Sequence, residues 1–232
     1  MSDLACSILV VAKAPVAGQA KTRLMTQFTA VQAADLAAAA LLDTLDAALH
    51  ASFAYKVVAL AGDIDEARMS AQLRVALKEF VVIPQDGDGF GERLTRAHVD
   101  AASLGGLPVL QIGMDTPQVT ATTLRDAALT LLAVENDVVL GPATDGGWWV
   151  IGLSTPDIAS IFSDIAMSQS DTGSKTIVAL SQAGCSMVEL ETMTDVDTPT
   201  EVWEVADQMD SSTHFVRTLT AIAANDKRRR VR

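Results

Sequence analysis

Apolar runs of four to eight residues alternate with amphipathic stretches over the first 140 residues, and this rhythm limits the fold more than any other feature. Buried strands are predicted at residues 5–12, 55–61, 79–83, 107–112 and 137–140. Helical spacing appears between them, at residues 30–50, 65–77, 90–104 and 120–134. Such βα repeats are typical of a mostly parallel sheet with helices on both faces, so we predict an α/β fold.

The rhythm changes after Gly147. Residues 148–153 form an apolar run with no helix before it, which favours an antiparallel strand. Helices are predicted at residues 155–165 and 171–183, from Thr198-Pro199 onward, and at residues 213–224, with a short strand at residues 186–190. Because no long linker interrupts the chain, we predict one domain over residues 1–210, followed by a C-terminal helix and basic tail over residues 211–232.

Composition excludes several classes of protein. A hydrophobic fraction of 49% excludes general disorder. The two cysteines, Cys6 and Cys185, lie in apolar runs and predict buried thiols rather than a disulfide scaffold. No run of about 18 apolar residues and no signal-peptide pattern occurs, so we expect a cytoplasmic protein with no membrane partner.

A net charge of -12 makes nucleic acid an unsuitable partner for the body of the protein. Five of its positive charges lie at residues 227–232, where we expect a frayed, solvated terminus. An acidic protein that handles phosphates must concentrate its remaining cations at one place, or use a metal. The sequence leaves the oligomeric state open.

One such concentration follows the first predicted strand. Lys13, Lys21 and Arg23 lie within eleven residues, and small residues including Gly18 separate them. Small residues let backbone N–H groups approach a ligand, while Lys and Arg supply charge for phosphate oxygens. The pattern indicates a phosphate cradle that is not a Walker A loop, and a solvated surface loop is the alternative.

Carboxylates follow later strands. Asp115 comes after the strand at residues 107–112, at the edge of the sheet where α/β proteins bind ligands. Asp195 and Asp197 point the same way if their segment is extended, and could join Asp115 at a metal. Mg²⁺ takes oxygen ligands of this kind. An ordinary turn capped by Asp115, and helix capping by Asp197 or Thr198, are the alternatives.

Two glycine-rich segments complete the set of motifs. Gly146 and Gly147 permit positive φ and hold Asp145 on a tight turn beside Trp148 and Trp149, one of which packs in the core while the other lines a pocket. The segment at residues 85–94 suggests a backbone wrapped around a base or ribose. A plain hairpin turn and a surface pair of Glu92 with Arg93 are the alternatives.

Taken together and in order, these segments resemble the bacterial glycosyltransferase-A-like transferases related to phospholactate guanylyltransferase, often called radical-SAM/selenodomain-associated transferases. The resemblance covers residues 5–205. It rests on Lys13 to Leu24, Gly91-Glu92-Arg93, Gly113 to Pro117, Gly141 to Gly147 and Asp195 to Pro199. Met114 and Thr116 depart from the threonine and cysteine expected around Asp115, which leaves the acceptor open.

The resemblance implies a Rossmann-like glycosyltransferase-A, or nucleotide-diphospho-sugar transferase, sandwich with Mg²⁺ or Mn²⁺ as cofactor. Its partners are a nucleoside triphosphate or nucleotide sugar and a small-molecule acceptor. The expected metal ligands are Asp115, Asp195 and Asp197, and the expected catalytic residues are Asp145 and Lys21. The expected nucleotide-binding residues are Lys13, Gly18, Lys21, Thr22, Arg23, Gly91, Arg93, Gly146 and Gly147.

Three functions remain open. The first is glycosyl transfer from a nucleotide sugar, with Asp145 contacting the sugar or acting as base. The second is nucleotidyl transfer to a small phosphorylated acceptor, in which Lys13, Lys21 and Arg23 stabilise departing pyrophosphate. The third is a non-catalytic nucleotide-binding protein, because fold alone does not dictate function.

Overall fold

The computed structural model describes residues 3–230, apart from the side chains of residues 227, 229 and 230. Within that range seven strands form one sheet in the order β3-β2-β1-β4-β6-β5-β7. The strands are β1 (Leu4–Lys13), β2 (Phe53–Ala61), β3 (Val81–Pro84), β4 (Val109–Gly113), β5 (Val138–Pro142), β6 (Trp148–Leu153) and β7 (Met187–Glu189). Only β6 runs antiparallel to its neighbours, β4 and β5. The predicted mostly parallel α/β sheet, with residues 148–153 reversed, is confirmed.

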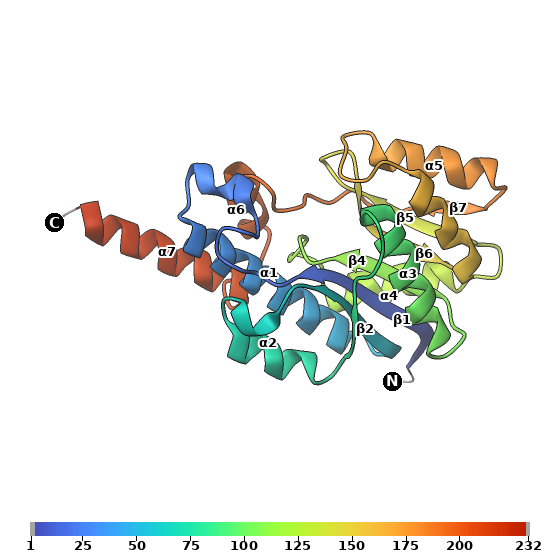
Figure 1. The fold of residues 1–232 in the computed structure, drawn as a ribbon, viewed down its shortest axis with the longest axis horizontal. Coiled ribbons are helices and arrows are strands. Elements are labelled where there is room, and N and C mark those ends of the chain that lie inside the picture. Colours follow the sequence, from blue (N-terminus) through green and yellow to red (C-terminus); the bar gives the residue numbers. More distant parts are fainter. Residues whose placement is uncertain (1–2, 231–232) are drawn as a thin grey trace.

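Helices cover both faces of the sheet (Figure 1). They are α1 (Ala30–His50), α2 (Ser70–Leu77), α3 (Phe90–Ser103), α4 (Ala121–Leu131), α5 (Thr172–Gln182), α6 (Pro199–Ala206) and α7 (His214–Arg230). Three 3₁₀ helices join them: η1 (Thr22–Thr26), η2 (Ile64–Glu66) and η3 (Pro156–Asp164). The apolar residues of α1, α2 and α4 pack on one face, and those of α3, η3 and α5 on the other. No helix of the described residues is both long and apolar enough to cross a membrane.

The layer outside α1 holds a second apolar cluster. Phe215 and Leu219 of α7 pack with Leu36 of α1 and Val202 of α6. Asp43 of α1 accepts hydrogen bonds from the backbone nitrogens of His214 and Phe215 at 2.8 Å each, which satisfies two amides of the first turn of α7. The C-terminal helix is therefore fixed at its start, and Figure 1 shows its far end extending beyond the rest of the molecule.

Three predicted segments differ from the structure. The helix expected at residues 65–77 is split into η2 and α2, because Met69 adopts a left-handed conformation with φ 52° and the amide of Arg68 donates to Pro15 O at 2.9 Å. The helix expected at residues 155–165 is the 3₁₀ helix η3. The backbone at residues 227–230 continues α7 instead of fraying, and residues 231–232 of the predicted tail lie outside the described range.

Burial of His98 on α3 predicts acid sensitivity. The side chain is fully buried, and desolvation lowers its pKa from 6.5 to about 4. In the unfolded chain this histidine takes up a proton below pH 6.5, whereas in the folded chain it stays neutral until about pH 4. The free energy of unfolding should therefore fall by about 3 kcal/mol as the pH falls through that window.

Urea unfolding at pH 7, 5.5 and 4 measures this loss. His98→Leu removes the titrating group, so the variant should lose less stability than the wild type between pH 6.5 and 4. Parallel losses in the two proteins would contradict the prediction.

Candidate active site

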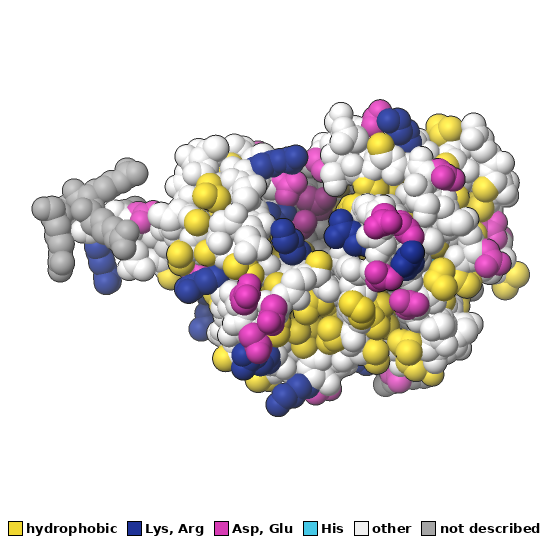
Figure 2. Space-filling view, in the orientation of Figure 1, with side chains coloured by type: hydrophobic (Ala, Val, Ile, Leu, Met, Phe, Trp, Pro, Cys, Tyr) yellow, Lys and Arg dark blue, Asp and Glu magenta, His cyan; other side chains and the backbone are white. Residues whose placement is uncertain are grey.

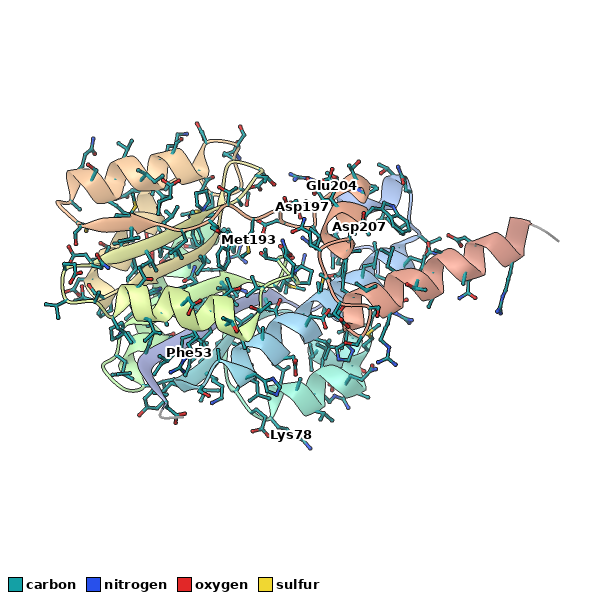
Figure 3. All side chains as sticks on the ribbon, turned by 180° about the vertical axis from the view of Figure 1, so that it is seen from behind. Phe53, Lys78, Met193, Asp197, Glu204 and Asp207 are labelled. Atoms are coloured by element: carbon teal, nitrogen blue, oxygen red, sulfur yellow. The ribbon has the colours of Figure 1, made fainter. Side chains whose placement is uncertain are left out.

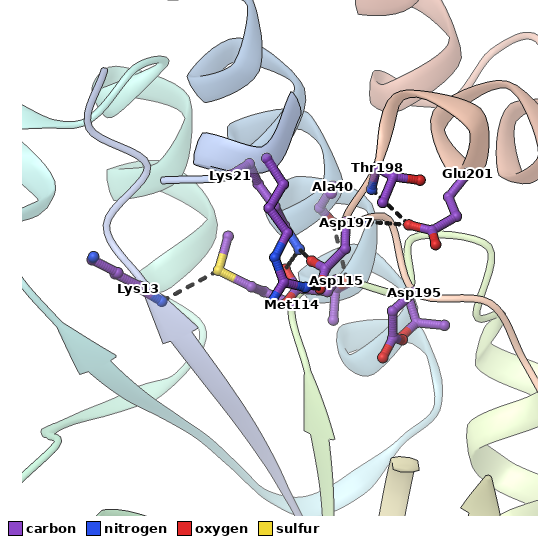
Figure 4. A network of polar contacts seen from close by, with 12 residues as sticks. Lys13, Lys21, Ala40, Met114, Asp115, Asp195, Asp197, Thr198 and Glu201 are labelled. Carbon is purple, nitrogen blue, oxygen red and sulfur yellow. Dashed lines mark hydrogen bonds and ion pairs between the residues drawn. The ribbon is translucent and has the colours of Figure 1, made fainter. Parts of the chain in front are cut away.

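Three segments that lie far apart in the sequence meet at the carboxyl end of β1 and β4 (Figure 4). They are the loop after β1 with η1, the turn after β4, and residues 194–198 before α6. The amide of Val196 donates to Asp115 O at 2.8 Å, and Thr116 Oγ1 donates to Asp195 Oδ1 at 2.7 Å. These bonds hold the carboxylates of the second and third segments together.

Lys21 lies at the centre of this junction. Its Nζ is 2.8 Å from Asp115 Oδ1 and 2.6 Å from Asp197 Oδ1, and only 10% of its side chain is exposed. The backbone of Lys21 is left-handed, with φ 50°, just before η1. Burial alone would lower the pKa of its ammonium, but the two carboxylates outweigh burial and raise the pKa above its ordinary value. Lys21 is therefore a permanently charged link between all three segments.

Asp197 is bound from both sides. It receives Lys21 and, at 3.3 Å, Arg23 Nη1. Burial would raise the pKa of this carboxyl, yet the charge of Lys21 beside it lowers the pKa overall. Capping of α6 is left to its neighbours: Thr198 is the N-cap, and Glu201 Oε2 accepts from the amides of Asp197 and Thr198 at 2.8 and 2.6 Å. The side chain of Asp197 thus remains available for the cations, and the capping alternative for this residue is wrong.

Asp195 lies deeper. Burial, with the negative charges of Asp115 and Asp145 nearby, raises the pKa of this carboxyl to about 7, although Thr116 and Lys21 act in the opposite direction. Val196 between Asp195 and Asp197 is buried, and both carboxylates line the same cavity. The alternation predicted for this segment is therefore observed.

The site consists of two adjoining cavities that share Arg23, Asp115 and Asp197 in their walls. The cationic cavity is lined by Lys13, Gln19, Ala20, Lys21, Thr22, Arg23, Ala37 and Met114 together with the two aspartates. The acidic cavity adds Asp145 and Asp195 and extends over an apolar wall from α3, β4 and β6. In Figure 2, acidic side chains lie inside a hollow of this face and basic side chains flank it.

Four of the predicted nucleotide-binding residues belong to the loop after β1 and line the cationic cavity: Lys13, Lys21, Thr22 and Arg23. Lys13 Nζ donates to Gln19 O at 2.9 Å, which folds the loop over. Gly18 has φ 79°, and no atom lies within 4 Å of the position that a Cβ would take. Its role in the loop is therefore conformational in this structure.

The turn at Asp145 combines two cavity residues, Asp145 and Gly147, with one packing residue, Gly146. Asp145 lines the acidic cavity and accepts from the amide of Gly147 at 2.8 Å. Gly146 has φ 90°, and a Cβ there would collide with the backbone of Ser170. The amide of Gly173, at the start of α5, donates to Gly146 O at 2.8 Å. Glycine is thus required at position 146 because the chain before α5 approaches it closely, whereas Gly147 lines the cavity.

The predicted pair Gly91 and Arg93 lies beside the acidic cavity, whose wall is formed instead by Phe90 and Leu94 of the same helix. A Cβ on Gly91 would collide with the backbone of Phe162 in η3, so this glycine allows close helix packing. The guanidinium of Arg93 lies 5.7 Å from the centre of the Phe90 ring. The predicted alternative, a pair of Glu92 with Arg93, is not formed, because Glu92 binds Arg96.

The described residues contain no group of three or more His, Cys, Asp or Glu arranged to hold a metal ion. The predicted ligands Asp115, Asp195 and Asp197 are therefore not a preformed cage, and Asp197 is occupied by Lys21 and Arg23. Four carboxylates nonetheless line the acidic cavity, whereas Arg23 is its one cationic lining residue among those described; Lys13 and Lys21 line the adjoining cationic cavity. That excess of negative charge suits a divalent cation that takes one or two carboxylates and completes its shell with phosphate oxygens.

Residues 44–169 match the model of a bacterial family described as "Uncharacterized protein conserved in bacteria (DUF2064)". The match covers more than half of the chain. The chain belongs to the DUF2064 family. The matched range includes Asp115 and Asp145 but not Lys21, Asp195 or Asp197, so part of this site lies outside it. No curated protein matches the sequence.

Solved structures share the fold of this DUF2064 protein. A provisionally named nucleotide-diphospho-sugar transferase from Desulfovibrio desulfuricans G20 is 26% identical, with a TM-score of 0.79 over 97% of this chain and 96% of its own. A nucleotidyl transferase from a Methanothermobacter species is 17% identical, with a TM-score of 0.57 over 92% and 98% of the two chains. Rv0371c of Mycobacterium tuberculosis H37Rv, solved with manganese, is 18% identical, with a TM-score of 0.52 over 88% and 99%.

These similarities confirm the predicted glycosyltransferase-A-like sandwich. Two of these structures, those from Desulfovibrio and Methanothermobacter, are named as transferases, and a transferase is the class of enzyme that they support for this DUF2064 protein.

Sequence reasoning missed part of the cavity wall. Gln111 lies within an apolar strand and Met167 lies outside every motif, while Phe90 and Leu94 belong to the glycine-rich segment at residues 85–94 but had no predicted role. An amide in a fully buried strand was the one available signal, because buried polar side chains need partners. The two tryptophans pack on opposite faces as predicted, with Trp149 buried in the core at 2% exposure, but both of them line the cavity rather than Trp148 alone.

Proposed function

We propose that this DUF2064 protein is a metal-dependent nucleotide-diphospho-sugar transferase. The observation that carries the proposal is the junction of a cationic cavity with an acidic one, linked by Lys21 between Asp115 and Asp197. A donor of this kind has a diphosphate that needs cations and a neutral sugar that hydrogen-bonds to carboxylates. The name of the Desulfovibrio relative supports the same class of donor.

Each wall of the junction has a role in this proposal. Lys13, Lys21 and Arg23 bind the diphosphate, with Lys21 as a point charge and Arg23 as a fork for two oxygens. Asp197 holds Lys21 and Arg23 in position. Asp145 contacts the sugar or takes a proton from the acceptor hydroxyl, since its carboxylate lines the cavity where both would lie.

A divalent cation, Mg²⁺ or Mn²⁺, fits beside Asp115 and Asp195, where the carboxylates outnumber the cations. When bound, it would neutralise charge on the leaving nucleoside diphosphate. The manganese complex of Rv0371c supports this cofactor. Asp115, on the turn after β4, and Asp195, which accepts a hydrogen bond from Thr116, are the residues that would hold the ion.

Nucleotidyl transfer to a small phosphorylated acceptor is the second candidate. Three cations line one small cavity, which suits a triphosphate and the departing pyrophosphate. Neighbours named as a nucleotidyl transferase and as a synthetase complexed with CTP favour this reaction. The resemblance of the sequence motifs to transferases related to phospholactate guanylyltransferase is part of the case for this second candidate. Release of pyrophosphate rather than nucleoside diphosphate distinguishes the two candidates.

The proposal predicts metal-dependent stabilisation by one class of donor. The full chain is heated with ATP, CTP, GTP, UTP or common nucleotide sugars, each with and without Mg²⁺ or Mn²⁺. A ligand at 100 times its Kd stabilises the folded state by about 2.7 kcal/mol, which a melting curve detects. Nucleotide sugars should give the largest shift, and EDTA should abolish it. A folded protein that no nucleotide shifts would contradict the proposal.

Asp115→Asn should lower the metal-dependent affinity for the donor by about tenfold or more. An amide is a weaker metal ligand than a carboxylate, and the substitution leaves Lys21 with one ion pair. Asp207→Asn is the matched control. Asp207 is exposed at the C-terminal end of α6, whereas Asp197 lies just before the helix begins (Figure 3). Titration of the donor at fixed Mn²⁺ measures both, and equal affinities in the two variants would argue against Asp115 as a ligand.

A further inference from the structure

The apolar wall of the acidic cavity contains two buried hydrogen-bond donors. Val11, Phe90, Leu94 and Met167 contribute to this wall, together with Trp148 and Gln111. Neither Gln111 Nε2 nor Trp148 Nε1 has a hydrogen-bond partner among the described residues, and both atoms are buried. Buried donors without an acceptor are uncommon in folded proteins, so each requires an explanation.

Gln111 is held in one orientation. It lies on β4 with no exposed surface, and its Oε1 is 3.4 Å from Nδ1 of the buried His98. A carbonyl oxygen only accepts hydrogen bonds, so His98 donates from Nδ1. His98 is therefore a positioning residue: it occupies the oxygen of the amide and leaves the nitrogen of Gln111 as the unpaired end at the cavity wall.

Trp148 is fixed by its neighbours. Its ring lies 5.8 Å from that of Phe162 at an interplanar angle of 32°, and Phe162 lies 6.3 Å from the ring of His98. The adjacent Trp149 shows how a buried indole is ordinarily satisfied, since its Nε1 donates to Glu191 O at 2.9 Å. Both tryptophans and Gln111 line the acidic cavity, but only the indole N–H of Trp148 is left without a partner among the described residues.

We propose that Gln111 and Trp148 are specificity-determining donors that bind oxygen atoms of an uncharged, apolar or aromatic part of a substrate. This inference rests on the proposed function, because it places that group in the same cavity as Asp115 and Asp145. The four carboxylates of the cavity disfavour an anion there, while the aromatic and aliphatic wall favours an apolar body. A carbonyl or amide group matches both conditions, on either the nucleobase of the donor or the acceptor.

The three tryptophans of the chain make a direct test feasible. The indole N–H signals of the full, ¹⁵N-labelled protein are recorded by NMR, and Trp148→Phe identifies the signal of Trp148. Trp203→Phe, an exposed tryptophan on α6, is the matched control. The probes are benzamide, which has a neutral carbonyl, toluene, which has none, benzoate, which is charged, and the nucleosides uridine and guanosine.

Benzamide should move the indole proton of Trp148 downfield, and toluene and benzoate should not. Gln111→Met should lower the affinity for benzamide about fivefold, the usual effect of one lost hydrogen bond. His98→Leu should also lower it, and toluene should again leave the signal unmoved. Trp203→Phe should bind benzamide as the wild type does. A shift with a nucleoside assigns the group to the donor, and a shift with benzamide alone assigns it to the acceptor.

Equal responses to toluene and benzamide, or a Trp148 signal that no probe moves, would overturn the proposal. If the indole proton of Trp148 resonates as far downfield as that of Trp149 before any probe is added, and no probe then moves it, water occupies this donor. None of these measurements needs a nucleotide or metal. Their outcome is therefore separate from that of the melting experiment above.

Discussion

Replacing Lys21 with methionine should lower turnover by about 10²–10³-fold, the largest effect expected of any single substitution in this chain. Methionine keeps the length of the side chain but removes the charge that binds both Asp115 and Asp197. The two carboxylates then repel each other and the phosphates of the donor. The rate is measured as release of nucleoside diphosphate or pyrophosphate from whichever donor stabilises the wild type.

Lys175→Met provides the control. Lys175 is half exposed on α5 and pairs with Asp171 at 2.8 Å, away from the cavities, so its removal should leave turnover unchanged. Circular dichroism checks that both variants fold. A folded Lys21→Met protein that turns over at the wild-type rate would remove Lys21 from the active site.

The second large effect concerns stability. Gly146→Ala should lower the free energy of unfolding by about 3 kcal/mol, because the residue has φ 90° and its new Cβ would collide with the backbone of Ser170. For a chain of this size the melting temperature should fall by about 6–12 °C. Thermal unfolding followed by circular dichroism measures the change.

Gly18→Ala separates the two causes. Gly18 has a similar positive φ of 79°, but no atom lies within 4 Å of the added Cβ. The free energy of unfolding of Gly18→Ala should therefore fall by only about 1 kcal/mol, the cost of placing an alanine at positive φ. Equal losses in the two variants would mean that the packing of residue 146 against the segment before α5 contributes little.

The sheet could be predicted because its signal is local. Residues 5–12 form a continuous apolar run, and β1 occupies Leu4–Lys13 inside the sheet, between β2 and β4, with most of its residues buried. The change of rhythm after Gly147 likewise identified the antiparallel β6. The break in the helix at Met69 was not predictable, because its cause is a contact between Arg68 and the loop after β1.

The site was predictable only in its parts. Lys21, Asp115 and Asp197 each appeared in a charged or acidic motif, but no local pattern says that one ammonium lies between two carboxylates from other segments. The three aspartates were expected to gather around one ion, whereas Asp197 binds cations of the protein. Gly91 and Gly146 were read as ligand contacts, and the structure explains both by the close approach of another backbone.

The bond between Lys21 and Asp197 joins residues that are 176 positions apart, and this separation affects how the protein is made. A ribosome that adds about 5–20 residues per second needs about 9–35 s to pass from one residue to the other. During that interval the nascent chain carries a lysine whose distal carboxylate partner has not been synthesised. The loop after β1 can therefore form its contact with Asp197 only late in translation, when residues 195–197 have left the exit tunnel.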